Sequence, residues 1–230
     1  MSRKLSPWPW IVAGSAFAAY PALRPYADET TLAGLAAMAS DRWLLAHLLG
    51  MLAFALVPLA LLTLRPLAPG SRAGRTAVAL AAVAAALLLP YYGGEAYGLH
   101  AIGRRAVATG DLSLLGVVDG FRYQPVAITT FGLGLLTVAV AGVLAAVAVR
   151  HRDVALRVSV GLVAVGLALY LPQFYAPAGL RIGHGFLLGL GCWAVAARLA
   201  RTGGGTGDEP RYRVSARPGS VVESAATKAS

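Results

Sequence analysis

The strongest constraint on this chain is a series of apolar runs, each about as long as a bilayer is thick. A helix needs roughly 20 apolar residues to cross a hydrocarbon core of about 30 Å, and runs of about this length, rich in Leu, Ala and Val, recur along the sequence. Of the 230 residues, 57% are hydrophobic and 13% are charged, whereas soluble proteins carry about 25% charged residues. The runs do not alternate as barrel strands do, so the predicted spans are helices.

The apolar runs divide the chain into a bundle and a tail. Residues 201–230 are rich in Gly, Ser and Pro and have no apolar period, which predicts a disordered cytoplasmic tail. Residues 1–200 are predicted to form an all-α polytopic membrane bundle, with no room for a soluble domain. The six expected spans cover about residues 8–23, 43–64, 77–98, 124–149, 154–171 and 181–200.

Basic residues lie mostly on one side of this topology. With the N-terminus inside, 14 of the 20 Lys and Arg residues fall in cytoplasmic segments and six in outer segments. The positive-inside rule therefore predicts that both termini are cytoplasmic. Arginine far outnumbers lysine amid abundant Ala, Gly and Leu, a composition typical of GC-rich bacteria, so we expect a bacterial cytoplasmic membrane.

The first segment has two interpretations. Its basic start, apolar run and small-residue stretch "SAFAAYPA" also resemble a signal peptide, whose cleavage would leave five spans. We favour an uncleaved helix, because Trp8 and Trp10 lie where an interfacial anchor belongs and Gly14 with Ala18 forms a small-residue packing face. Similar close helix contacts are predicted at Gly132 with Gly134, Gly161 with Ala164 and Ala168, and Gly185 with Gly189.

Two of the three outer connections carry apolar stretches. In residues 24–42, "TLAGLAAM" predicts a short amphipathic helix, after which Ser40 or Asp41 caps the second span. Residues 99–123 are expected to form the larger outer loop, in which "LSLLGVV" is apolar enough to lie in the membrane interface.

Composition also excludes several classes of function. The net charge of +10 lies on short loops and the tail, where topology and anionic lipid account for it, so nucleic acid is not an expected partner. Cys192 is the only cysteine, which excludes an internal disulfide and a cysteine-based metal site. The expected partners are the lipid bilayer and other membrane proteins.

Polar residues at membrane depth gather at the outer ends of the predicted spans. Such residues are costly in a bilayer and are usually functional. His47 and His184 each lie within about 5 to 8 Å of the outer mouth of a helix, and Glu95 and His100 close the third span on the same side. An electropositive rim of Arg42, Arg122 and Arg181 beside helix N-termini is a candidate site for an anion or a lipid headgroup.

Glu95 and His100 are not expected to act together. Five residues on a straight helix correspond to about 140° of net rotation, so the two side chains point to different faces. Pro90 and the Gly93–Gly94 pair could unwind this turn and change that geometry. His100 is interpreted as a solvated interfacial residue, and Glu95 as either a site residue or the partner of an outer arginine.

Four functions compete for these residues. The first is a non-catalytic membrane component, such as an assembly factor, which needs no special residues and is favoured on base rates. The second is a b-type haem protein with His47 and His184 as axial ligands, which requires the second and sixth spans to bring these residues together. The third is an outer-face metal-dependent or lipid-directed hydrolase, with a divalent metal on His47, Glu95, His100 and His184. The fourth is a small transporter, which is disfavoured because the sequence shows neither a mid-membrane acid nor an inverted repeat.

The opening of the second span carries a resemblance. The stretch "DRWLLAHLLGMLAFALVPLALLTLR", with Trp-x-x-x-His at its start and Pro58 within it, resembles a loose group of small multi-pass membrane proteins of GC-rich bacteria. The resemblance covers this helix and the general layout. It implies a role for Trp43 and His47 and implies no activity.

Overall fold

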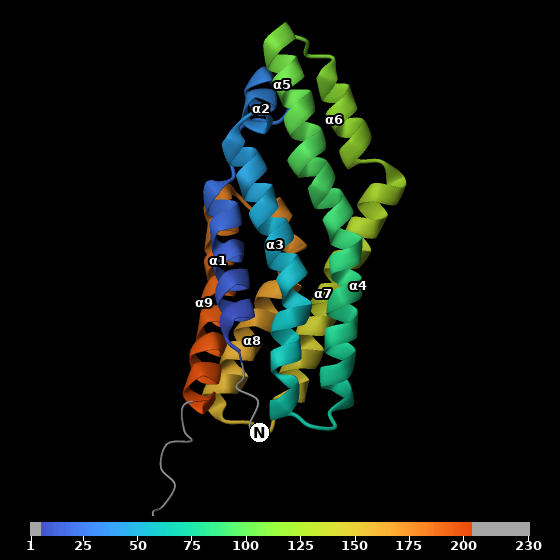
Figure 1. Cartoon of the computed structure of the whole chain (residues 1–230). Helices are drawn as coiled ribbons and strands as arrows, with labels where there is room; N and C mark the ends of the chain where they lie inside the picture. The colour runs from blue at the N-terminus through green and yellow to red at the C-terminus, as the bar shows by residue number, and fades with distance from the viewer. Residues whose placement is uncertain (1–5, 204–230) are drawn as a thin grey trace, which may run out of the picture.

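A computed structural model describes residues 6–203, and within this range the chain has helices and no strand (Figure 1). The prediction of an all-α fold is confirmed. The predicted tail lies outside the described residues except for positions 201–203, which belong to the last helix. The elements are α1 (Trp8–Leu23), α2 (Leu32–Met38), α3 (Asp41–Thr63), η1 (Arg65–Leu67), α4 (Arg72–Gly93), η2 (Gly94–Gly98), α5 (Leu99–Thr109), α6 (Leu114–Arg122), α7 (Pro125–Ala148), α8 (Val154–Ala168), η3 (Pro172–Tyr175) and α9 (Ala178–Gly203).

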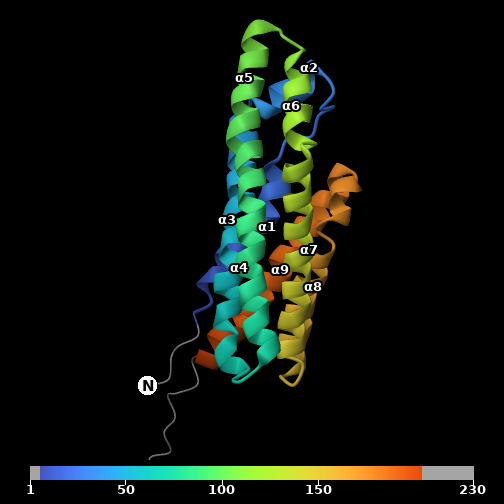
Figure 2. The same cartoon turned by 90° about the vertical axis from the view of Figure 1, so that its right-hand side faces the viewer.

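Six of these helices pack side by side in a closed ring. The order around the ring is α1, α3, α4, α7, α8 and α9, and α9 packs back against α1. The start of α1 and the end of α9 lie at one end of the ring, with the α3–α4 and α7–α8 connections (Figures 1 and 2). We call this the proximal end. The opposite, distal end carries α2, α5 and α6.

Four helical segments are long and apolar enough to cross a membrane. By length and composition they are Asp41–Leu67, Arg72–Thr109, Pro125–Ala148 and Ala178–Arg201. The other two ring helices are shorter, 16 residues in α1 and 15 in α8. A proline accounts for the end of α1, because the residue before a proline avoids helical geometry, and Arg24, which precedes Pro25, has a ψ of 125°. Helix α8 ends at Ala168, shortly before the Pro172 that begins η3.

The third predicted span continues well beyond its expected end. Residues 72–109 form one nearly continuous rod, in which α4 passes through the π-helical turn η2 into α5. Residues 99–123 are therefore a helical hairpin of α5 and α6 instead of the predicted loop. Its turn includes Gly110, whose φ of 68° is in the left-handed region that favours glycine.

The distal helices pack together around a small apolar cluster of their own. Leu35 and Met38 of α2 meet Leu99 and Ala106 of α5. Gly103 permits this packing, since a Cβ there would lie 2.6 Å from the Leu35 carbonyl oxygen. The predicted short helix is confirmed as α2. Ser40 caps α3 as expected, with its hydroxyl accepting a hydrogen bond from the Trp43 backbone N–H.

The predicted glycine contacts divide into two groups. A Cβ added at Gly14, Gly134 or Gly185 would lie within 3 Å of a neighbouring helix, so these glycines do permit close packing. Gly132 and Gly161 have open space at that position. For these two the packing prediction was wrong, because a small residue also suits a helix face that has no neighbour.

Candidate functional site

A cavity of about 770 Å³ opens at the distal end of the ring. Its volume is within the range of roughly 300–1,000 Å³ that is usual for small-molecule sites. Residues of α1, α3, α4, α6, α7 and α9 and of the connecting segments line it. The charged and titratable side chains among them include Arg24, Asp28, Glu29, His47, Glu95, Arg122 and Arg181, and the aromatic ones include Tyr20, Tyr26, Tyr91, Tyr92, Phe131 and Phe174.

Trp43 and His47 fix one wall of the cavity from α3. His47 Nδ1 lies 2.8 Å from the Trp43 carbonyl oxygen, one helical turn earlier. A carbonyl only accepts hydrogen bonds, so Nδ1 carries the hydrogen and the second ring nitrogen, Nε2, faces the site. The indole Nε1 of Trp43 donates to the Glu95 backbone carbonyl at 2.7 Å. The Trp-x-x-x-His pattern therefore connects α3 to the turn that carries Glu95.

Glu95 reaches the cavity from the π-helical turn η2 (Gly94–Gly98). Such turns are often found at functional sites because they interrupt the regular spacing of a helix. Gly94 begins the turn and leaves room for Phe121 of α6, whose ring occupies the place that a Cβ at Gly94 would take. This close approach brings the end of α6, with Arg122, against Glu95.

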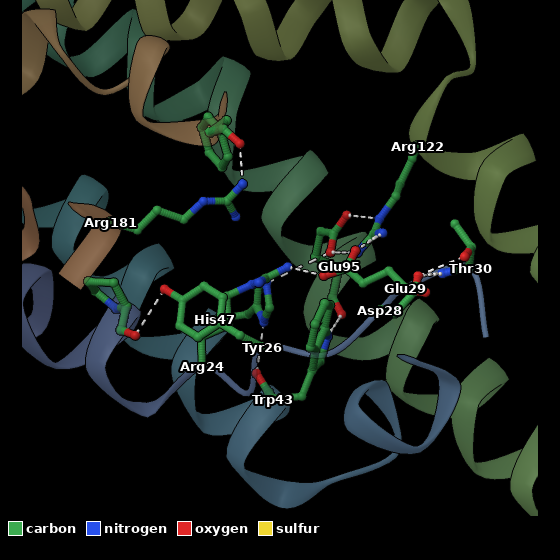
Figure 3. A network of polar contacts seen from close by, with 12 residues as sticks. Arg24, Tyr26, Asp28, Glu29, Thr30, Trp43, His47, Glu95, Arg122 and Arg181 are labelled. Atoms are coloured by element: carbon green, nitrogen blue, oxygen red, sulfur yellow. Dashed lines mark hydrogen bonds and ion pairs between the residues drawn. The ribbon is translucent and has the colours of Figure 1, made fainter. Parts of the chain in front are cut away.

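The central interaction of the site is a two-point ion pair between Glu95 and Arg122 (Figure 3). The Nε and Nη2 atoms of Arg122 lie 2.8 and 2.9 Å from the two carboxylate oxygens of Glu95. Both side chains are largely buried, with exposed fractions of 13% for Arg122 and 9% for Glu95. Glu95 was interpreted above as either a site residue or the partner of an outer arginine. The structure shows such a partner, Arg122.

Glu29 extends this pair into a network. It contacts Arg122 through Nη1 and Arg24 through Nη2, the latter at 2.5 Å. Burial alone would raise the pKa of the Glu29 carboxyl, but the two guanidinium groups outweigh that effect and lower it. Arg24 also lies over the Trp43 ring, 4.7 Å from its centroid. The network thus joins the α1–α2 connection, the π turn and the end of α6.

Arg181 enters the site from the side opposite to Arg122 (Figure 3). Its Nε donates to the Ala176 carbonyl at 2.9 Å and its Nη2 to the Phe174 carbonyl. In the described part of the chain no carboxylate pairs with Arg181, whereas Arg24 and Arg122 are matched by Glu29 and Glu95. Within residues 6–203, Arg181 is therefore the cavity arginine without a carboxylate partner, because the third lining acid, Asp28, is exposed and bonds Thr30.

The structure separates the candidate residues predicted from the sequence. His47 and Glu95 line the cavity, with His47 Nε2 3.7 Å from a Glu95 oxygen. His100 instead bonds the Met38 carbonyl at 3.0 Å, and as expected it does not share the partners of Glu95. Of the predicted anion-binding arginines, Arg122 and Arg181 line the cavity, while Arg42 is exposed and does not.

The four candidate ligands of a metal or haem, His47, Glu95, His100 and His184, are not gathered in one place among the described residues. Among residues 6–203 no three His, Cys, Asp or Glu side chains are grouped so that they could hold a metal ion. His184 Nε2 lies 2.7 Å from the Gly166 carbonyl, and α1 packs between the helices that carry His47 and His184. Haem or metal binding by these residues stays a prediction.

Sequence reasoning missed several residues of the site. Arg24 was counted only as an outer charge, and Glu29, Tyr20 and Tyr26 were not singled out. The sequence did contain a signal for Arg24 and Glu29, because both closely follow the first predicted span on the outer side. The third predicted span ends near Glu95 on that same side.

No protein-family model, curated protein or solved structure matches this chain, so no activity or partner is suggested by a relative.

Proposed function

We propose that this chain is a non-catalytic bacterial membrane protein whose distal cavity binds a small organic anion. In this proposal the ring of six helices spans the cytoplasmic membrane, with both termini in the cytoplasm. Four helices are long and apolar enough for that role. The proximal connections carry Arg65, Arg72, Arg150 and Arg152, as the positive-inside rule requires of a cytoplasmic side. The cavity then faces outward.

The observation that carries the proposal is the unmatched charge of Arg181 inside an aromatic-walled cavity. Two N–H groups of its guanidinium are held by backbone carbonyls, which fix the group in place. Arginine has five such donors in a planar fork, so donors remain for a bound carboxylate or phosphate. An anion would pair with this guanidinium, and the Tyr and Phe side chains would cover its organic part.

The acid–base groups of the site favour binding over catalysis. Both carboxylate oxygens of Glu95 accept hydrogen bonds from Arg122, which leaves Glu95 poorly placed to accept a proton from a substrate. His47 differs, because the Trp43 carbonyl holds its Nδ1–H and its Nε2 keeps a lone pair that faces the site. The proposal of a binding site therefore rests on the paired state of Glu95 and on Arg181, and His47 is available as a hydrogen-bond acceptor for a ligand.

The floor of the cavity favours a binding protein over a transporter. On its proximal side the ring interior is filled by Phe17, Phe54, Tyr92 and Tyr170, with neighbouring ring centroids 4.8 to 6.0 Å apart. The hydroxyls of Tyr92 and Tyr170 lie 3.2 Å apart and close the centre. A ligand that enters from the distal end meets packed aromatic rings.

The test is anion-dependent stabilisation of the purified protein in lipid nanodiscs. The panel runs from inorganic phosphate and acetate through butyl phosphate to monododecyl phosphate, and the readout is the midpoint of thermal unfolding. A ligand at about 100 times its Kd adds roughly 2.7 kcal/mol to the free energy of unfolding. We expect at least one anion to raise the midpoint, and Arg181→Gln to abolish the rise.

Arg42→Gln is the matched control, because Arg42 is an exposed distal arginine outside the cavity. It is expected to leave the rise in the midpoint unchanged. If no anion in the panel raises the midpoint, or if both variants respond as the original protein does, the proposed function is wrong.

A further inference from the structure

We infer that the anion is the headgroup of a membrane amphiphile, which reaches the cavity sideways from the bilayer between α7 and α9. This inference rests on the proposed function, because it assigns the ligand class of the same cavity. Three features of the described residues support it: the length of α8, the division of the cavity into a charged and an apolar side, and the depth of the apolar side.

The short helix α8 leaves the ring incomplete at its distal end. At 1.5 Å per residue, the 15 residues of α8 extend about 22 Å, against about 36 Å for the 24 residues of α7. Helix α8 packs against both α7 and α9 and separates them. Beyond Ala168 the wall between α7 and α9 consists of the short η3 segment, which lies to the side of α7 in Figure 2.

The cavity is charged on one side and apolar on the side of this gap. Its ion network comes from the α1–α2 connection, η2 and α6. The side formed by α7, by Leu171 with η3 and by the start of α9 contributes Ile128, Phe131, Gly132, Leu171, Phe174 and Ala178. Phe131 and Phe174 are in ring contact, with centroids 5.6 Å apart, so the proposed exit lies beside this pair, at Ile128 and Gly132. Arg181 lies where the two sides meet, held by the carbonyls of Phe174 and Ala176. An anionic headgroup attached to an alkyl chain is complementary to this division.

With α7 spanning the membrane, as the proposed function has it, the apolar side lies at the depth of a bilayer's acyl chains. Helix α7 begins at Pro125 and is itself a candidate span. Gly132 is seven residues further along, which is about 10 Å into the helix. Ile128 has 43% of its surface exposed, and Gly132 has open space around its Cβ position. A chain that leaves the cavity here passes directly into lipid, where it loses no hydrophobic burial.

The ligand class is therefore a single-headed anionic amphiphile. Arginine binds a carboxylate or a phosphate through two parallel hydrogen bonds, so the headgroup chemistry is an organic acid or a phosphomonoester. A cavity of about 770 Å³ holds such a headgroup and the first part of its chain. The rest of the chain lies between α7 and α9.

The experiment compares monododecyl phosphate with butyl phosphate in nanodiscs that contain the full chain. Gly132→Phe places a ring in the proposed exit, where the open Cβ position accommodates it. We expect this variant to weaken dodecyl phosphate binding about tenfold more than butyl phosphate binding, equivalent to losing roughly two methylene contacts that only the longer chain makes. Ile128→Trp, at an exposed position of the same wall, is expected to act in the same direction.

Gly161→Phe is the matched control, because Gly161 also has open space around its Cβ position but does not line the cavity. It should leave the binding of both ligands unchanged. If neither Gly132→Phe nor Ile128→Trp weakens dodecyl phosphate binding selectively, sideways access is refuted, while Arg181-dependent binding of butyl phosphate would keep the proposed function. If neither ligand binds in an Arg181-dependent way, both proposals fail together.

Discussion

The ion pairs at the two ends of the helical ring differ in how deeply they are buried. At the proximal end Arg198 and Asp153 pair at 2.7 Å with 31% and 49% of their side chains exposed. At the distal end Arg122 and Glu95 pair at 2.8 Å with 13% and 9% exposed. The contact distances are nearly equal, so the difference between the pairs is burial.

Burial decides what each pair contributes to stability. An exposed pair is largely screened by solvent and contributes about 0 to 1 kcal/mol. A buried pair is not necessarily stabilising as a whole, but removing one partner leaves an uncompensated charge in a low-dielectric site and costs roughly 3 to 5 kcal/mol. The distal network is therefore stable only when it is complete, and the proximal pair is dispensable.

The largest expected effect comes from Glu95→Gln. This change removes one of the two carboxylates that neutralise Arg122, and because Glu29 still contacts Arg122, we expect a loss of about 3 kcal/mol, the lower end of the range for broken buried pairs. The measurement is the free energy of unfolding from SDS titration in mixed micelles, followed by tryptophan fluorescence.

Asp153→Asn is the control for this prediction. The Asp153 carboxylate also caps α8 by accepting a hydrogen bond from the Leu156 backbone N–H, and Asn preserves that cap. The expected loss is therefore less than about 1 kcal/mol. Equal losses for Glu95→Gln and Asp153→Asn would show that burial does not distinguish the two ends.

A second prediction concerns the contact between α1 and α9, which depends on close packing at glycine and, within the described residues, involves no ion pair. A Cβ at Gly14 of α1 would lie 2.7 Å from Cys192 Cβ and 3.1 Å from the Gly189 carbonyl oxygen of α9. Gly14→Ala should therefore force the two helices apart and cost about 1 to 3 kcal/mol in the same unfolding assay. Gly161→Ala has open space and should be neutral or stabilising, because alanine favours a helix by up to about 1 kcal/mol over glycine. A loss of the same size in both variants would contradict close α1–α9 packing.

The sequence predicts where the helices lie better than it predicts which of their residues form the site. Apolar length and prolines determine where most ring helices begin and end, and these signals are local. The continuous rod through η2 was missed because Pro90, Gly93 and Gly94 suggest a break, whereas the turn packs against Trp43 and Phe121 and the chain stays helical. Tertiary contacts of this kind have no local signature.

The same reasoning explains which site residues were found. Glu95 and His47 were recognised because a polar residue in an apolar run is conspicuous. Glu29 lies in a polar connection, where an acid is ordinary, and only the fold places it between Arg24 and Arg122. Arg42 was selected for its position near a helix start, but its side chain is exposed. Whether a charged residue belongs to the site depends on the direction in which its side chain points. Its position along the sequence does not give that direction.

The smallest predicted effect tests the distal network through pH. The folded protein lowers the pKa of the Glu29 carboxyl below its ordinary value of 4.5, since Arg24 and Arg122 outweigh burial. A group with a lowered pKa stabilises the fold above its unfolded pKa and loses that contribution as pH falls through the folded pKa. Stability should therefore decline as pH is lowered below about 4.5, and Glu29→Gln should decline less steeply than the original protein over that interval. Some decline should remain in Glu29→Gln, because the pKa values of Asp28, Asp111 and Asp153 are also lowered. Parallel stability curves for the two proteins between pH 5 and pH 3 would show that Glu29 is no more tightly held than an exposed carboxylate, and the contrast between the two ends would then depend on Glu95 alone.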